Sequence, residues 1–130
     1  MVVEEIMNRE PAKIAPEATL SEALQAMADH KTRHLVVIGE GNHVAGILSD
    51  RDLAMAYDPK GMTAERWEKV RVDELMSADP SSIGSQAPLA EAAKLLIRLF
   101  VSALPVVDNG ILRGILSEKE FVRYFAARAD

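Results

Sequence analysis

The sequence predicts a mixed α+β protein made of two β-α-β-β-α units, packed sheet to sheet with pseudo-twofold symmetry. Three observations predict this class. The chain repeats itself internally, and each copy holds one amphipathic helical stretch followed by two short β-rich runs. Its 130 residues are 48% hydrophobic and 27% charged, which is typical of a globular domain. One copy of about sixty residues would leave a face of its sheet bare, so two copies are expected to cover each other.

The repeat is visible when the chain is compared with itself at an offset of 69 residues. Val3–Met7 (VEEIM) then aligns with Val72–Met76 (VDELM). One residue is lost in a turn, after which Gly46–Ser49 and Gly114–Ser117 share the string GILS. The duplication therefore extends from the first residues of each copy to its last β-rich run.

The extent of the repeat predicts the organisation of the chain. We expect a first unit at 1–57, a second unit at 72–130 and a linker at 58–71. Within the linker, Thr63 is expected to cap a short helix, and Trp67 is expected to anchor the segment on the body of the protein.

The elements of each copy are predicted in the same order. An extended stretch around Ile14 or Ile83 is followed by a helix whose apolar residues recur with the 3.6-residue period. These apolar residues are Leu20, Ala23, Leu24 and Met27 in the first copy, and Leu89, Ala92, Ala93, Leu96, Ile97 and Phe100 in the second.

Two β-rich runs and a closing helix complete each copy. The β-rich runs are 35–38 and 44–48 in the first copy, and 104–107 and 111–116 in the second. The connecting segments contain Gly and Asn, which adopt positive φ at low cost and so favour hairpin turns. The closing helices are expected near 51–57 and 119–128.

Charge and composition exclude several classes of function. The chain has 15 Lys and Arg against 20 Asp and Glu, so it lacks the basic footprint of a nucleic-acid or anionic-membrane binder. The absence of cysteine excludes disulfides, Cys-ligated metals and thiol chemistry. The sequence shows neither a secretory signal nor an apolar run long enough to span a bilayer. We therefore expect a cytoplasmic protein with no nucleic-acid or membrane partner.

The same polar string follows the last strand of both copies. Ser49 precedes Asp52 by three residues, and Ser117 precedes Glu120 by three. This spacing is that of a capping box, in which the serine and the acid satisfy the first amides of a helix. The same residue types also suit a nucleoside phosphate, because a helix start attracts anions, Arg51 or Lys119 supplies positive charge, and the acid can accept from ribose hydroxyls. The spacing alone leaves both interpretations open.

The order and duplication of these motifs resemble a pair of CBS domains, the cystathionine-β-synthase-type regulatory module. The segments that carry the resemblance are Val3–Met7 with Pro11, Pro16–Leu20, Leu35–Ile38, Gly46–Leu53, Leu104–Asp108 and Gly114–Phe121. The resemblance implies clefts between the two units that bind adenosine-containing ligands. It implies that the serine and the acid contact phosphate and ribose, and that backbone at the first two strands of each copy holds the base.

The charge chemistry of Arg51 and Lys119, together with the resemblance, thus assigns fourteen positions to ligand binding. Those of the first copy are Lys13, Ile14, His34, Leu35, Ser49, Arg51 and Asp52, and those of the second are Ser82, Ile83, Ala103, Leu104, Ser117, Lys119 and Glu120. The second copy departs from the family pattern, because Glu120 replaces the usual Asp or Asn and Ser85 stands where the first copy has Pro16. The site of the first copy is therefore expected to bind nucleotide better.

We therefore expect a stand-alone regulatory module that senses AMP, ADP or ATP, with no catalysis of its own and no required cofactor. Two alternatives stay open: a structural or interaction module whose serines only cap helices, and a sensor of another adenosyl ligand such as S-adenosylmethionine or NAD. His30 and His34 are four residues apart at a predicted helix end, and we predict no metal site there. The protein regulated by the module is not identifiable from the sequence.

The helix of the second copy carries more apolar residues than one buried face needs. The residues of this surplus are Leu95, Leu96, Ile97, Leu99, Phe100 and Val101. A homodimer would remove their outer side chains from water. CBS pairs are commonly dimers, so the resemblance implies the same association.

Overall fold

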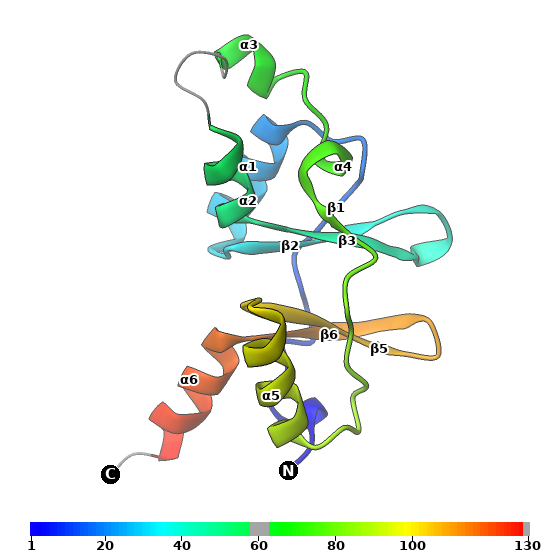
Figure 1. Cartoon of the computed structure of the whole chain (residues 1–130), viewed down its shortest axis with the longest axis vertical. Helices are drawn as coiled ribbons and strands as arrows, with labels where there is room; N and C mark the ends of the chain where they lie inside the picture. The colour runs from blue at the N-terminus through cyan, green and yellow to red at the C-terminus, as the bar shows by residue number, and fades with distance from the viewer. Residues whose placement is uncertain (58–62, 129–130) are drawn as a thin grey trace. The chain divides into compact units, whose positions relative to one another are not determined.

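The computed structural model describes residues 1–57 and 63–128, and it confirms the mixed α+β class. The chain divides into two compact units (Figure 1). We call Ala12–Pro80 the central unit, and Met1–Pro11 together with Ser81–Asp130 the terminal unit. Of the predicted linker, residues 58–62 lie outside the described residues.

The central unit is a four-stranded sheet in the order β1-β2-β3-β4, with α1 and α2 on one face (Figure 1). Strand β1 is parallel to β2, and the other neighbours are antiparallel. Its elements are β1 (Lys13–Ile14), α1 (Leu20–His30), β2 (His34–Ile38), η2 (Glu40–Asn42), β3 (Val44–Ser49), α2 (Asp50–Ala56), α3 (Ala64–Trp67), α4 (Val72–Leu75) and β4 (Ser77–Ala78). The predicted β-α-β-β-α order is confirmed, whereas the short edge strand β4 is an addition that the sequence pattern does not predict.

Helix α1 begins and ends where its sequence requires. Thr19 Oγ1 accepts from Glu22 N, and Glu22 Oε1 accepts from Thr19 N, each at 3.1 Å, so the two residues form a capping box. Leu20, Ala23 and Met27 lie on one face and are buried. The helix ends at Lys31, which adopts the left-handed conformation. Of the apolar positions predicted for this helix, Leu24 is the one that is exposed.

The terminal unit is built on one long hairpin. Its elements are η1 (Val3–Glu5), α5 (Leu89–Leu99), β5 (Ala103–Asp108), β6 (Ile111–Ser117) and α6 (Glu118–Arg128). Asn109 and Gly110 both have positive φ at the turn, as the hairpin signal predicts. The extended stretch at Ile83 forms a single parallel bridge with Val106 rather than a strand.

The compact units do not coincide with the sequence repeats, because the two repeats exchange their first segments. Val3 packs in the core of the terminal unit, and Val72 packs in the core of the central unit. The exchanged segments make equivalent backbone bonds: Val3 N donates to Ala87 O at 3.0 Å, and Val72 N donates to Ala18 O at 2.7 Å. Each repeat therefore starts by completing the core of the other.

Two glycines allow this exchange, and both stand in the middle of a strand. A Cβ at Gly46 would lie 2.6 Å from Ser77 O, and a Cβ at Gly114 would clash with Asn8 O. Ser77 and Asn8 belong to the segments that follow the two exchanged turns. The close approach at each glycine is therefore made by the chain's own backbone.

We expect Gly114→Ala to lower the free energy of unfolding by about 1–3 kcal/mol, because the added methyl group would have to displace Asn8. The matched control is Gly39→Ala, since the nearest atom to a Cβ at Gly39 is 3.8 Å away. Chemical denaturation of both variants measures the difference. Equal midpoints for the two variants would contradict the role given to Gly114.

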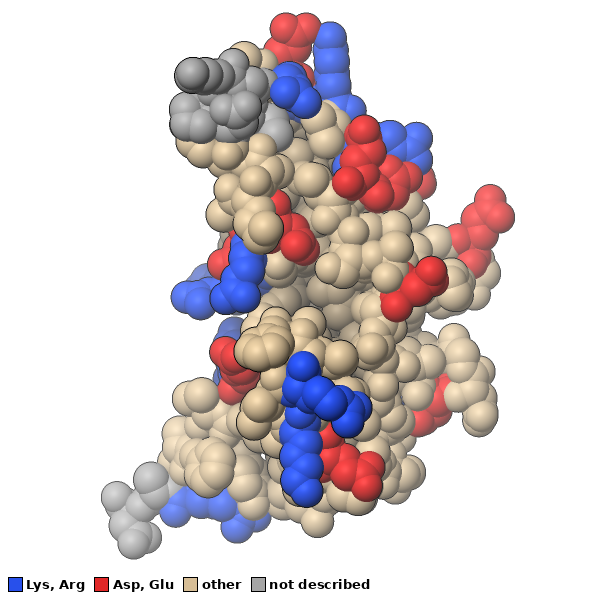
Figure 2. All heavy atoms as spheres, viewed as in Figure 1, with Lys and Arg blue, Asp and Glu red and all other residues tan. Residues whose placement is uncertain are grey.

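The surface agrees with the mixed charge of the sequence. Figure 2 shows Lys and Arg side chains interspersed with Asp and Glu on the visible face. Across residues 1–57 and 63–128, no helix is long and apolar enough to cross a membrane.

Candidate ligand-binding site

The site residues predicted in the first copy all lie in the central unit, with Lys13 and Ile14 on β1 and the others at the junction of β3 and α2 or at the facing start of β2. His34 at the start of β2 is paired with Ser49 at the end of β3. Asp50 N, the first amide of α2, donates to Arg33 O at 2.9 Å. These pairings hold the start of β2 beside the end of β3, so that polar residues from both gather at one end of these two strands.

Ser49 and Asp52 form the predicted capping box. Asp52 N donates to Ser49 Oγ at 3.1 Å, and Ser49 N donates to Asp52 Oδ2 at 2.8 Å. Both side chains are half-buried. The serine oxygen acts here as an acceptor, and within the described part of the chain its hydroxyl donates no hydrogen bond. The capping interpretation is therefore confirmed for this junction, and it leaves the Ser49 proton available to an incoming acceptor.

The junction of β6 and α6 repeats this backbone geometry in the terminal unit. Ala103 is paired with Ser117, and Glu118 N donates to Ser102 O at 3.1 Å. The side chains are arranged differently. Ser117 Oγ and Ser117 N both donate to Glu120 Oε1, at 2.6 and 2.7 Å, and both residues are buried. The serine proton of this junction is therefore already bonded to the acid.

The residues expected to hold a base lie on or next to the strands that lead to these junctions. Lys13 and Ile14 pair with Val36 and Val37 across β1 and β2. In the terminal unit, Ile83 N donates to Pro105 O at 3.1 Å, and Val107 N donates to Ile83 O at 3.0 Å. The side chains of Leu35 and Leu104 are fully buried in hydrophobic cores, so only their backbone could meet a ligand. Ser82, the neighbour of Ile83, is exposed.

The basic residues of the two junctions differ between the units. Arg51 and Lys119 are both exposed and occupy equivalent positions, and no ion pair among the described residues engages either. Arg33, which the sequence interpretation missed, has its backbone fixed next to α2 by the bond from Asp50. Its structural counterpart is Ser102, so the central unit carries one more cation at this point.

A second feature that the sequence interpretation missed is an open pocket of about 600 Å³ in the terminal unit. It is lined by Glu5, Ile6, Met7, Asn8, Arg9, Glu10, Glu120, Arg123 and Tyr124. Of the predicted site residues, Glu120 lines this pocket. Its other walls come from the exchanged first segment and from Arg123 and Tyr124 of α6, which no local pattern brings together.

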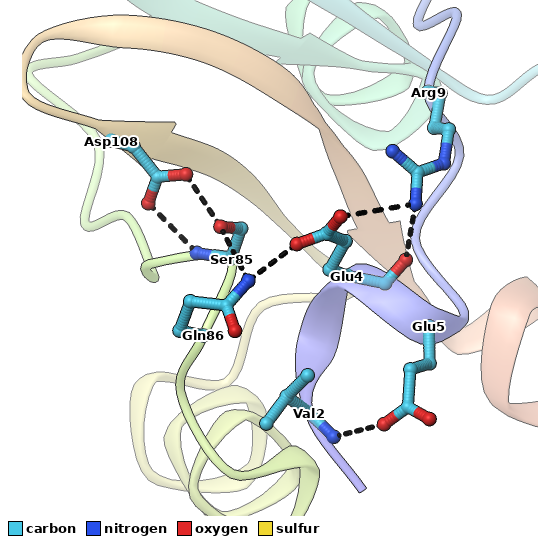
Figure 3. A network of polar contacts seen from close by, with 7 residues as sticks. All are labelled: Val2, Glu4, Glu5, Arg9, Ser85, Gln86 and Asp108. Atoms are coloured by element: carbon cyan, nitrogen blue, oxygen red, sulfur yellow. Dashed lines mark hydrogen bonds and ion pairs between the residues drawn. The ribbon is translucent and has the colours of Figure 1, made fainter.

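The exchanged segment is held in the terminal unit by a polar network that includes Glu4 (Figure 3). Gln86 Nε2 donates to Glu4 Oε2, and Arg9 Nη2 donates to Glu4 O at 3.2 Å. Next to Gln86, Ser85 donates to Asp108 through Oγ at 2.5 Å and through N at 3.0 Å. Ser85 stands where the first copy has Pro16. Its two bonds connect the segment before α5 to Asp108 at the end of β5.

The two bonds from Ser85, first from its hydroxyl and then from its amide, hold the pKa of Asp108 below its ordinary value. A carboxylate whose pKa is lower in the folded chain stabilises the fold above its unfolded pKa, and this contribution is lost as pH falls through the folded pKa. We therefore expect Asp108→Asn to destabilise the protein most near neutral pH and progressively less in acid. Urea titrations at several pH values measure this, with Glu40→Gln as an exposed control. A pH-independent difference between wild type and Asp108→Asn would contradict it.

The family comparisons identify what the chain is similar to. A family model for the CBS domain matches residues 3–58 and 72–127. The chain is 30% identical over 129 residues to a CBS domain-containing protein of Dictyostelium discoideum, across 94% of this chain and 89% of that protein. It is 29% identical to the CBS domain-containing protein YhcV of Bacillus subtilis, across 88% of this chain and 79% of that protein.

Solved structures share the fold. A protein with CBS domains from Burkholderia ambifaria superposes with a TM-score of 0.88 at 24% identity, over 100% of this chain and 97% of that one. The CBS domain pair of protein MJ0100, in complex with 5′-methylthioadenosine and S-adenosyl-L-methionine, superposes with a TM-score of 0.83 at 22% identity, over 99% and 98%. At these identities the likeness establishes the fold.

Proposed function

The chain belongs to the CBS domain family, and from this premise we propose that it is a regulatory module that senses an adenine nucleotide of the AMP, ADP or ATP type. The observation that carries the proposal is the junction of β3 and α2. It combines a Ser49 hydroxyl that donates no bond within the described residues, the half-buried Asp52 carboxylate and the exposed Arg51 guanidinium. These groups match the phosphate and the ribose of a nucleotide.

The proposed binding mode assigns one role to each group. Ser49 Oγ donates to a phosphate oxygen, and Arg51 and Arg33 neutralise the phosphate charge. Asp52 Oδ1, the oxygen that the capping box leaves over, accepts from the ribose hydroxyls. Backbone at Lys13–Ile14 and His34–Leu35 contacts the base.

The protein MJ0100, whose CBS domain pair has this fold, binds two adenosyl compounds. This supports an adenosyl ligand for the present chain as well. Arg51 and Arg33 favour a phosphate over the cationic sulfonium of S-adenosylmethionine. S-adenosylmethionine and NAD remain the alternative ligands. The other alternative is a structural or interaction module, which the capping bonds of Ser49 would equally serve.

Regulation would follow from differential binding. A nucleotide that binds one arrangement of the protein more tightly than another shifts the population toward that arrangement. A partner protein that binds the favoured arrangement would then bind more tightly as the nucleotide concentration rises. The protein would act in the cytoplasm, for which the absence of cysteine is the supporting feature of the sequence.

A thermal-shift panel tests this proposal against the alternatives. At a ligand concentration of about 100 times Kd, one site stabilises the fold by about 2.7 kcal/mol. For a protein of this size, we expect the melting temperature to rise by about 5–15 °C. The panel contains AMP, ADP, ATP, NAD and S-adenosylmethionine. A flat response to all five would overturn nucleotide sensing and leave the structural module.

We also propose that the module is a homodimer formed through α5 and α6 of the terminal unit. Ile97 and Phe100 are 75% and 88% exposed at the end of α5, and Val122 and Phe125 are 66% and 69% exposed on α6. Val122 and Phe125 are three apart within α6, so they share one side of that helix. Phe100 is the left-handed residue that ends α5. Leu95, in contrast, is half-buried, and Leu99 is 37% exposed, which is less than Ile97 or Phe100.

The charges of these helices favour a second copy as the partner. Helix α6 has Glu118 in its first turn and Arg128 in its last, and α5 has Glu91 and Arg98 in the same order. When either helix packs antiparallel against its own copy across a twofold axis, acid meets base at both ends. The charges of Glu118 and Arg128, and of Glu91 and Arg98, therefore suit a second copy.

A further inference from the structure

The two strand-to-helix junctions of the chain have the same backbone but use the serine proton differently. In the central unit, Ser49 Oγ is an acceptor, and the bond comes from Asp52 N at 3.1 Å. In the terminal unit, Ser117 Oγ is a donor, and its bond goes to Glu120 Oε1 at 2.6 Å. Glu120 has one methylene more than Asp52, and this length brings its carboxylate onto the serine hydroxyl.

This difference acts directly on a phosphate, because phosphate oxygens accept hydrogen bonds and a hydroxyl has a single proton to give. Ser117 has already committed its proton to Glu120. A phosphate at this junction would have to break that bond. It would also face the carboxylate of Glu120, a residue that is 6% exposed, whose negative charge is poorly screened by water.

The cations that could offset this repulsion are fewer in the terminal unit. Ser102 takes the place of Arg33, as the matching bonds from Glu118 N and Asp50 N show. Phe100 takes the place of Lys31, and both adopt the left-handed conformation that ends the preceding helix. Of the three basic residues Lys31, Arg33 and Arg51, only Arg51 has a basic counterpart in the terminal unit, which is Lys119.

The pocket beside Glu120 shows which charges surround its carboxylate. The pocket that Glu120 lines has a volume of about 600 Å³, which is within the range of small-molecule sites. Its walls carry the carboxylates of Glu5, Glu10 and Glu120 against Arg9 and Arg123, and Arg9 is paired with Glu4. The lining is therefore large enough for a ligand but unfavourable for an anion.

From these contacts we propose that Glu120 closes the terminal junction to phosphate, and that each chain therefore takes up one nucleotide, at Ser49. Glu120 is thus the residue that makes the two halves of the duplicated module unequal. This inference rests on the proposed function, because it specifies which of the two junctions serves it.

The test replaces Glu120 by the residue type of the other junction. Calorimetric titration of the wild-type full chain with ATP should give one site per chain. In Glu120→Asp the shorter side chain should release the Ser117 proton, and a second site should appear. In an Asp52→Ala background, Glu120→Asp should restore ATP binding by about tenfold or more, the value of a charge-assisted hydrogen bond.

Glu118→Asp is the matched control, because it makes the same change at the exposed neighbour in the same helical turn and should add no site. Glu120→Asn, which also shortens the side chain, replaces Glu120→Asp if that variant loses its native circular dichroism. The role of Glu120 would be overturned if the wild-type chain bound two ATP molecules. It would also be overturned if Glu120→Asp and Glu120→Asn each still bound only one. Either result would leave nucleotide sensing intact. No ATP binding by any variant would overturn the proposed function itself.

Discussion

Asp52→Ala is expected to weaken nucleotide binding by about 30- to 1000-fold, because the ribose hydroxyls lose their charged acceptor. Asp52 is the acid of the β3–α2 junction, and one of its oxygens is free of the capping box. Glu120→Ala should leave binding at Ser49 undiminished, since Glu120 belongs to the other junction. Isothermal titration calorimetry with ATP compares the two variants.

The control for Asp52→Ala is Asp50→Ala, which removes an exposed carboxylate from the same helical turn outside the capping box. Loss of the capping box itself costs about 0.5–2 kcal/mol of stability, so circular dichroism must show that Asp52→Ala is folded at the titration temperature. Equal losses of affinity in Asp52→Ala and Glu120→Ala would show that the two junctions are equivalent. That result would contradict the ranking given to them.

Replacement of Ile97 and Phe125 together by Glu is expected to halve the mass of the protein in solution. Both side chains are more than half exposed, and a dimer would bury them at about 25 cal/mol per Å² of apolar surface. Two buried carboxylates facing their own copies would reverse this gain. Light scattering measures the mass, and far-ultraviolet circular dichroism shows whether the helices persist.

Ile111→Glu is the matched control for the dimer, because Ile111 is 61% exposed in the same unit but lies on the hairpin. It should leave the mass unchanged. A wild-type protein that is monomeric at micromolar concentration would contradict the proposed dimer. Unfolding of the double variant would instead assign Ile97 and Phe125 to packing within the chain.

Much of the fold follows from local sequence signals. The 3.6-residue pattern predicts α1, and the Thr19 and Ser49 capping boxes fix where two helices begin. Asn109 and Gly110 predict the hairpin turn because they reach positive φ at low cost. Each of these features depends on residues a few positions apart, which is the range over which sequence patterns carry information.

The exchange of first segments could not be predicted in this way. Val3 and Val72 are equivalent in the repeat, and each would fit the hydrophobic core of either copy. A first segment could pack on its own copy or on the other copy. The pattern of apolar residues is the same in both cases, so it does not distinguish them. The pocket beside Glu120 was missed for the same reason, since residues 5–10 reach it only through the exchange.

The site itself was predictable in its residue types but not in its hydrogen bonds. Both Ser-x-x-acid strings predict a cap, yet Ser49 accepts where Ser117 donates. The extra methylene of Glu120 is visible in the sequence, but the direction of the serine proton depends on where the folded backbone places both groups. The fourteen assigned ligand contacts stay predictions.

The measurement that tests nucleotide sensing most directly is an ATP titration of the isotope-labelled wild-type chain, followed by amide chemical shifts. We expect saturable shifts at Ser49, Asp50 and Asp52, with much smaller shifts at Ser117 and Glu120. Unchanged amide shifts at Ser49–Asp52 with millimolar AMP, ADP and ATP would contradict the central claim, because a bound phosphate cannot accept a bond from Ser49 without altering the amides of the same helical turn.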